Sequence, residues 1–397
     1  MSVTDRVEPT LFAPWPVFEA DEIAAATAVL ASGKVNYWTG TEGRRFEEEF
    51  ASATGVRKAI VLANGTVALE AIFEALEIGV GDEVIMAPRT FLASASAVVR
   101  TGGTPVFVDI DRRTGNIDPA AVERAITPRT KAVLAIHLAG WPCDMPALAS
   151  LCETHRLHLI EDCAQAHGAA YRGQPVGSFG VASAWSFCQD KIMTTAGEGG
   201  MITTDDETLW SRIWSLKDHG KSFDAVYHRE HAPGFRWLHE SFGTNWRLPE
   251  VQSAIGRIQL RKLSEWHRKR TENAETLLDA WAALPALRCE RPGPDERHAY
   301  YKFYVYVRPE MLAEGWSRDR IMHEVIQEGV PCFTGSCSEI YLEKAFTGIG
   351  MGPERRLPAA KELGETSLMF QVHPTLSPDS MRRTAEVVRY VVERATR

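Results

Sequence analysis

Lys191 occupies an unusual position for a charged residue. It follows the apolar run 181–187 and precedes a Gly-Glu-Gly-Gly turn at 197–200, after which a second apolar run covers 201–204. A lysine framed by buried segments is partly desolvated, which favours the uncharged amine and makes it a nucleophile toward carbonyl groups. The same sequence is also compatible with a lysine that extends from a loop into solvent. The choice between the two interpretations depends on other parts of the chain.

Asp162 comes two residues after an apolar run that ends at Ile160, so we expect it at the end of a central strand. A carboxylate at that depth must meet a cation. The cation is either an arginine in an ordinary ion pair or the protonated nitrogen of a bound heterocycle.

A possible phosphate cradle lies at Asn64, Gly65 and Thr66, between a buried strand and a helix. The free N–H groups and the positive dipole end at the start of a helix suit a phosphate. A threonine that merely caps the helix gives the same pattern.

One cofactor requires an amine, a buried carboxylate, a phosphate cradle and an aromatic plate together, and it is pyridoxal phosphate, PLP. In this interpretation the PLP aldehyde joins Lys191, and Asp162 keeps the pyridine nitrogen protonated. Ser186 and Thr66 hold the phosphate, and Phe91 is the aromatic plate. The isolated cysteines lack the spacing of a zinc site, so no metal is expected.

These residues all follow short apolar runs that we predict to be strands. The runs cover 59–62, 83–86, 105–108, 132–136, 157–160, 181–185 and 201–204. Helical patterns separate several of them, which is typical of a mostly parallel sheet in an α/β domain. Ligands bind beyond the carboxyl ends of such strands, where Lys191 and Asp162 are expected.

The chain of 397 residues is long enough for two domains. An amphipathic helix that begins near residue 249 leads out of the α/β domain, and an alternating strand at 302–307 is followed by helical patterns at 318–328 and 378–393. We therefore predict a large domain over residues 1–255 and a smaller α+β domain over residues 256–397.

The charge distribution excludes some classes of partner. The net charge of -8 is spread along the chain without a basic stripe, which argues against nucleic-acid binding. The polar start at residues 1–10 is unlike a signal peptide, and no apolar run is long enough to span a membrane. A cytoplasmic protein without a membrane partner is expected.

An ordered set of motifs resembles the DegT/DnrJ/EryC1/StrS family of PLP-dependent sugar aminotransferases. The motifs are Glu161-Asp162-Cys163-Ala164-Gln165-Ala166-His167-Gly168, Gly177-Ser178-Phe179-Gly180, Ser186-Phe187 with Lys191, Gly197-Glu198-Gly199-Gly200, His219-Gly220 and Gly243-Thr244-Asn245-Trp246-Arg247. The resemblance is colinear from about residue 22 to 263 and weaker afterwards.

The resemblance implies a fold-type I PLP transferase, similar to aspartate aminotransferase, that works as a homodimer with shared active sites. By motif, Lys191 resembles the lysine that forms the Schiff base, and Asp162 the partner of the pyridine nitrogen. The other positions similar to cofactor ligands are Gly65 and Thr66 at the phosphate, Phe91 stacked on the ring, Gln165 near the ring hydroxyl, Ser186 at the phosphate, and Asn245 delivered from the other subunit.

The implied reaction is a ping-pong transamination. An amino acid, in this family usually glutamate, converts PLP to pyridoxamine phosphate (PMP), which then aminates a keto group of a nucleotide-linked sugar for polysaccharide or antibiotic biosynthesis. A cyclitol or aminobenzoate-type aminotransferase of antibiotic pathways shares these motifs. Related sugar dehydratases have histidine in place of the lysine, and the intact set Lys191, Asp162 and Ser186 argues against a non-catalytic protein. The segment Cys188-Gln189-Asp190 departs from many relatives, which bears on substrate preference.

Four further residues are candidates for the substrate site. His137 ends a predicted strand, where it either touches substrate or is satisfied by a neighbouring carbonyl. His167 is expected to line the site. Arg247 either meets an anionic group of a substrate or forms an interfacial ion pair. Tyr37, with Trp38, Tyr300 and Tyr301, either walls a nucleotide-sugar cleft or packs in a dimer.

Overall fold

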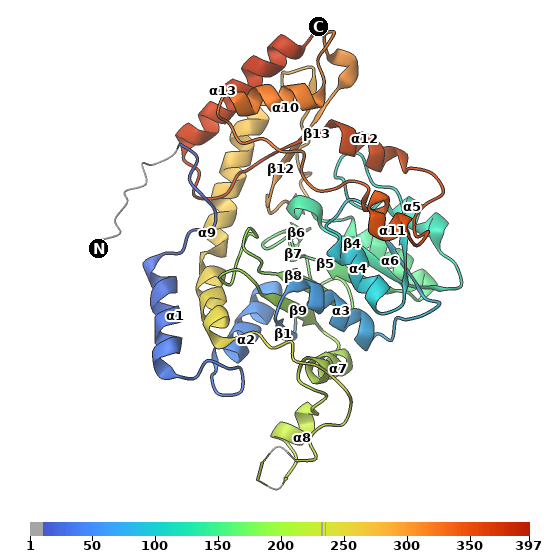
Figure 1. Ribbon diagram of the computed structural model, residues 1–397, viewed down its shortest axis with the longest axis vertical. Helices are drawn as coiled ribbons and strands as arrows, with labels where there is room; N and C mark the ends of the chain where they lie inside the picture. The colour runs from blue at the N-terminus through green and yellow to red at the C-terminus, as the bar shows by residue number, and fades with distance from the viewer. Residues whose placement is uncertain (1–10, 232, 235) are drawn as a thin grey trace.

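A seven-stranded sheet forms the centre of the fold (Figure 1), seen in a computed structural model that describes residues 11–231, 233–234 and 236–397. The predicted polar start at residues 1–10 lies outside the described residues. The strands are β1 (Lys58–Leu62), β2 (Glu83–Met86), β3 (Thr104–Phe107), β4 (Thr130–Ile136), β5 (His158–Asp162), β8 (Ala182–Ser186) and β9 (Gly200–Thr204). Their order is β1-β9-β8-β5-β4-β2-β3, and only β9 runs antiparallel to its neighbours. All seven predicted strands and the mostly parallel sheet are confirmed.

Helices cover both faces of this sheet, which explains why its strands are apolar on both sides. Ile60 and Leu62 of β1 pack with α3 (Gly65–Ala75), α4 (Ala93–Arg100) and α7 (Glu207–Lys217). The alternate residue Val61 faces the layer that contains α2 (Glu42–Thr54). On that second face α5 (Pro119–Ala125) and α6 (Met145–His155) cover β2 and β4.

Helix α9 (Glu250–Trp281) leads from the sheet to the C-terminal part of the chain (Figure 1). It contacts α1 (Ala20–Ser32) and α2 at one end and α13 (Pro378–Ala395) at the other. The predicted boundary at residue 255/256 falls inside this helix, and the division into two domains stays a prediction. No helix in the described part of the chain combines the length and apolarity needed to cross a membrane.

The C-terminal part is built on a three-stranded antiparallel sheet of β10 (Leu287–Arg288), β12 (Phe303–Val307) and β13 (Ser367–Phe370). Trp281, Phe303 and Val388 belong to its apolar core. Helix α10 (Arg318–Gln327) contributes to this core, whereas α11 (Lys344–Thr347) and α12 (Pro358–Thr366) pack into the two apolar layers of the central sheet. Strand β11 (Glu296–Arg297) joins β6 (Ala170–Tyr171) and β7 (Gln174–Pro175) in a small separate sheet.

The segment between α7 and α9 projects from the body of the molecule at the end that carries α8 (Phe223–Tyr227) (Figure 1). Two of its aromatic side chains are almost fully exposed, Trp237 at 91% and Phe242 at 98%. Large exposed aromatic groups are typical of surfaces that another protein covers.

Candidate functional site

A cavity of about 730 Å³ opens at the carboxyl ends of the central strands. Ile136 of β4 pairs with Asp162 of β5, and Asp162 pairs with Ala184 of β8, so these strand ends lie side by side. All three residues line the cavity, together with the starts of α3 and α4. Tyr301, Tyr304 and Met369 from the C-terminal part close its other side. This is the position at which ligands bind in α/β sheets.

The cavity brings together most of the predicted cofactor residues. Those that line it are Gly65, Thr66, Phe91, Asp162, Gln165, Ser186 and Lys191. Asn245 and the four candidate substrate residues Tyr37, His137, His167 and Arg247 are not part of its lining.

Lys191 lies in the loop after β8 and is anchored through its backbone. Its carbonyl oxygen accepts a hydrogen bond of 2.8 Å from Trp15 Nε1. Three residues later, Thr194 N donates to Gln259 Oε1 of α9 at 2.7 Å. The Lys191 Nζ atom lies over the Tyr301 ring, 5.0 Å from its centroid, with no ion-pair partner among the described residues. The amine is therefore positioned and free to react.

Asp162 is a buried carboxylate without a cationic partner in the described part of the chain, and 7% of the residue is exposed. Its Oδ1 atom accepts from Ala164 N at 3.1 Å, and its Oδ2 atom accepts from Ser94 Oγ at 2.8 Å. Each carboxylate oxygen keeps a further lone pair. A charge at this depth calls for a cation, which the protonated nitrogen of the PLP ring would supply.

The start of α3 forms the expected anion cradle. Asn64 Oδ1 caps the helix by accepting from Val67 N at 3.0 Å, and the first helical N–H groups have no partner inside the helix. Gly65 lies so close to β8 that an added Cβ would approach Ser186 Cβ to 2.8 Å. Ser186 Oγ, itself an acceptor from Cys188 N at 3.3 Å, therefore lies beside the helix start. This group of donors suits a phosphate.

Phe91 and Gln165 occupy opposite environments in the cavity wall. Phe91 is 70% exposed, so its ring is available to a planar ligand. Gln165 is buried, and its Oε1 atom accepts from Ala139 N at 2.7 Å. The amide nitrogen of Gln165 is then the group left to donate to a ligand oxygen.

The two candidate histidines are buried away from the cavity lining. His137 Nε2 interacts with Glu161 Oε2 at 3.0 Å, and Cys143 N donates to His137 Nδ1 at 3.0 Å, so this side chain is satisfied by its neighbours. His167 packs against Trp185 and Phe187, and neither ring nitrogen has a hydrogen-bond partner among the described residues. Burial lowers the pKa of His167 to about 3, which keeps it neutral.

The other three predicted residues outside the cavity lie near the projecting segment. Tyr37 is buried and its phenol contacts Glu47 Oε2 at 3.0 Å. Arg247 Nη1 pairs with Asp218 Oδ1 at 2.8 Å within the same chain. Asn245 is exposed and not in the cavity wall, and its predicted contact with a partner's cofactor stays a prediction.

Several cavity residues were not predicted from the sequence. Ser94 stands four residues after Thr90, and the two hydroxyl oxygens lie 2.9 Å apart beside Asp162. Ser94 belongs to the first turn of α4, whereas Thr90 lies in the turn before that helix, so their contact follows from the fold and not from a helical spacing. Lys302 and Tyr304 come from β12 and its approach, far from the cofactor motifs in sequence, and no local pattern marks them.

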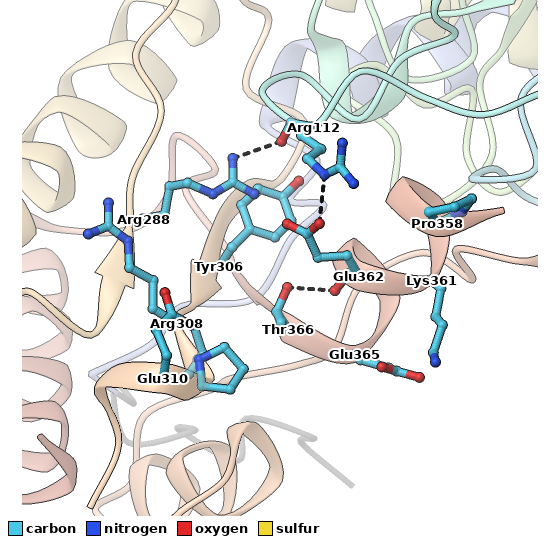
Figure 2. Close-up of a pocket in the computed structure, with 12 residues that line it drawn as sticks. Arg112, Arg288, Tyr306, Arg308, Glu310, Pro358, Lys361, Glu362, Glu365 and Thr366 are labelled. Atoms are coloured by element: carbon cyan, nitrogen blue, oxygen red, sulfur yellow. Dashed lines mark hydrogen bonds and ion pairs between the residues drawn. The ribbon is translucent and has the colours of Figure 1, made fainter. Parts of the chain in front are cut away.

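A second cavity, of about 680 Å³, lies between β12 and α12 (Figure 2). Two of its four cationic side chains form ion pairs: Arg112 Nε pairs with Glu362 at 2.6 Å, and Arg288 Nη1 pairs with Glu290 at 2.9 Å. None of the predicted site residues lines it. The candidate site is therefore the cavity at the strand ends.

Comparison with known proteins identifies close relatives. Residues 16–389 match the "DegT/DnrJ/EryC1/StrS aminotransferase family". The chain is 36% identical over 384 residues to "dTDP-3-amino-3,4,6-trideoxy-alpha-D-glucose transaminase" of Streptomyces venezuelae, covering 97% of this chain and 95% of the relative.

Two solved structures show the same fold. The aminotransferase from Psychrobacter cryohalolentis superposes with a TM-score of 0.95 at 56% identity, covering 97% of this chain and 99% of that one. A putative sugar aminotransferase from Streptococcus pneumoniae in its PMP form has a TM-score of 0.85 at 25% identity, covering 95% and 96%.

Proposed function

The chain belongs to the DegT/DnrJ/EryC1/StrS aminotransferase family, and from this premise we propose that it is a PLP-dependent enzyme that transfers an amino group from an amino acid to a nucleotide-linked ketosugar. The observation that carries the proposal is one cavity that holds Lys191, Asp162 and the α3 anion cradle at adjacent strand ends. Bound PLP supplies an electron sink for the carbanion formed when the substrate loses its α proton.

The roles of the protein groups follow from their positions. Lys191 would hold the cofactor through its Nζ atom, and its amine would carry the proton that the substrate loses, acting as general acid and base. Asp162 keeps the ring nitrogen protonated. The start of α3 with Thr66 and Ser186 binds the phosphate, Phe91 stacks on the ring and Gln165 donates to its hydroxyl.

Nucleotide-linked sugars are the acceptor class that the relatives support. The Streptomyces venezuelae relative is named for a dTDP-linked amino sugar, and its similarity extends over nearly the whole of both chains. Glutamate is the proposed donor. Lys191 itself argues against the related dehydratases, which have histidine there.

We also propose that the active form is a homodimer whose sites are shared. Asn245 is exposed in the projecting segment that carries Trp237 and Phe242, whose rings a partner subunit would cover. In the dimer Asn245 then reaches the phosphate of the partner's cofactor.

Two measurements test the function. Borohydride reduction followed by peptide mapping should attach the cofactor at Lys191, and Lys191→Ala should abolish transamination; labelling at another lysine would contradict the assignment. The PMP form should then be incubated with a panel of nucleotide ketosugars, of which at least one is expected to restore the absorbance of the PLP form. If only cyclitol ketones restored the absorbance of the PLP form, the acceptor would be a cyclitol and not a nucleotide-linked sugar.

A further inference from the structure

The cavity contains a second ammonium group that the proposed chemistry does not use. Lys191 and Lys302 are the only cationic side chains among the described residues that line it. Both lie over the same ring, because Lys302 Nζ is 4.6 Å and Lys191 Nζ is 5.0 Å from the Tyr301 centroid. A second positive charge therefore lies against the same tyrosine ring as the reacting amine.

Asp190 keeps this second charge neutralised in a loose contact. The distance between Lys302 Nζ and Asp190 Oδ2 is 3.5 Å, longer than a strong hydrogen bond between charged groups. The same carboxylate oxygen accepts a hydrogen bond of 2.5 Å from the Tyr301 phenol, and the Asp190 side chain is 54% exposed. Because more than half of the Asp190 side chain is exposed, it can turn toward solvent when another anion takes its place at Lys302.

We propose that Lys302 binds the α-carboxylate of the amino-acid donor and that Asp190 occupies this position in the absence of donor. The inference rests on the proposed function, since it takes Lys191 as the reaction centre. In an α-amino acid the carboxylate is one bond from the carbon that loses its proton, so an anion held at Lys302 places that carbon beside Lys191. The phosphates of a nucleotide-linked sugar are in general several bonds further from the keto carbon.

The two half-reactions of a ping-pong enzyme allow a direct test with the holoenzyme. Lys302→Met should raise the glutamate concentration that half-saturates PMP formation by at least about tenfold, because a charge-assisted contact is lost. The concentration of 2-oxoglutarate that half-saturates the return reaction should rise equally. The half-reaction with the nucleotide ketosugar should change by less than about threefold, and Lys302→Arg should restore most of the donor affinity.

Asp190→Asn provides a test of opposite sign. It removes the competing carboxylate, so donor affinity should increase by a few-fold. If Asp190 and Lys302 formed only a structural pair, both variants would weaken donor binding, and the proposal would fail. Lys269→Met is the matched control, because this exposed lysine forms a similarly loose pair with Glu265 at 3.8 Å.

Equilibrium binding separates affinity from turnover. Titration with 2-methylglutamate, which has no α proton, should change the cofactor absorbance at higher concentration in Lys302→Met than in wild type. A defect confined to the ketosugar half-reaction would assign Lys302 to a sugar phosphate and overturn the inference. Unchanged affinities in both half-reactions would overturn it as well. If no ketosugar reacts but the donor half-reaction is normal, the proposed acceptor is wrong and the Lys302 test still stands.

Discussion

The Asp162 carboxylate is held by one hydrogen bond from Ser94 and one from the backbone of Ala164. Asp162→Asn keeps the size of the side chain but removes the charge that stabilises a protonated ring nitrogen. We expect the variant to retain the cofactor and to lose turnover by about 10²-fold or more, as when a group that stabilises transition-state charge is removed. Single-turnover kinetics and the cofactor absorbance measure the two effects. Near-normal turnover would mean that the ring proton is held by another group.

Ser94→Ala should produce a smaller loss. The hydroxyl donates to a carboxylate, and such bonds contribute about 1.5–3 kcal/mol, so a decrease in kcat of about tenfold or more is expected. Ser94→Thr keeps the hydroxyl and is the control. Equal activity of the alanine and threonine variants would contradict a role for Ser94 in positioning Asp162.

The affinity for the donor should also depend on pH. Burial lowers the pKa of Lys302 below its ordinary value of 10.5, with Lys191 and Arg270 acting in the same direction and Asp190 opposing them. The charged form exists below this pKa, so the half-saturating glutamate concentration should rise as the pH increases through it. The Tyr301 phenol does not add a titration of its own to this range, because burial and the Asp190 charge raise its pKa.

Lys302→Arg is the control for this pH dependence. A guanidinium stays protonated throughout the accessible range, so the rise in half-saturating glutamate at alkaline pH should become smaller. Titration of the donor's own amine affects wild type and variant alike. An identical pH profile in both proteins would assign the effect to the donor and not to Lys302.

At the scale of elements, the close approach of α3 to β8 determines the shape of the phosphate cradle. Gly65→Ala would place a Cβ 2.8 Å from Ser186 Cβ, so the helix start must shift. We expect a loss of about 1–3 kcal/mol in the free energy of unfolding, together with weaker retention of cofactor. Chemical denaturation and dialysis against cofactor-free buffer measure these effects.

Gly79→Ala is the matched control, since its nearest non-neighbouring atom would be at 3.6 Å, an ordinary contact. It should leave the retention of cofactor unchanged. If Gly65→Ala also retains cofactor normally, the start of α3 is not the phosphate site.

Sequence patterns predict the buried elements of this protein better than its small ones. The strands of the central sheet are apolar on both faces and flanked by helices, so their positions could be predicted. The short strand β10 and the chain that leads to α12 have no such period. The site residues divide in the same way. Asp162 ends β5 and Lys191 lies in the loop after β8, so the strand pattern places both. The orientation of His137 depends instead on Glu161, a partner that no spacing identifies.

At the scale of the whole molecule, a shared active site predicts complementation between inactive variants. Lys191→Ala lacks the reacting amine, and Asn245→Asp places a negative charge near the partner's phosphate. In mixed dimers one site has Lys191 from one chain and an intact Asn245 from the other. Co-expression of both variants should restore about one quarter of the wild-type activity if subunits pair at random. No recovery would mean that Asn245 serves its own chain or that no dimer forms.

Helix α9 connects distant parts of the molecule through contacts near its start, in its first half and at its end. Glu250 accepts from the N–H groups of Glu42 and Gly43, Gln259 from Thr194 in the Lys191 loop, and Trp281 Nε1 donates to Ala385 O of α13. An insertion of one residue between these positions would rotate everything beyond it by about 100°. Seven inserted residues would nearly restore the rotation but lengthen the helix by about 10 Å. Both the length and the helical phase of α9 are therefore fixed, and we expect natural insertions and deletions to accumulate in the projecting segment instead.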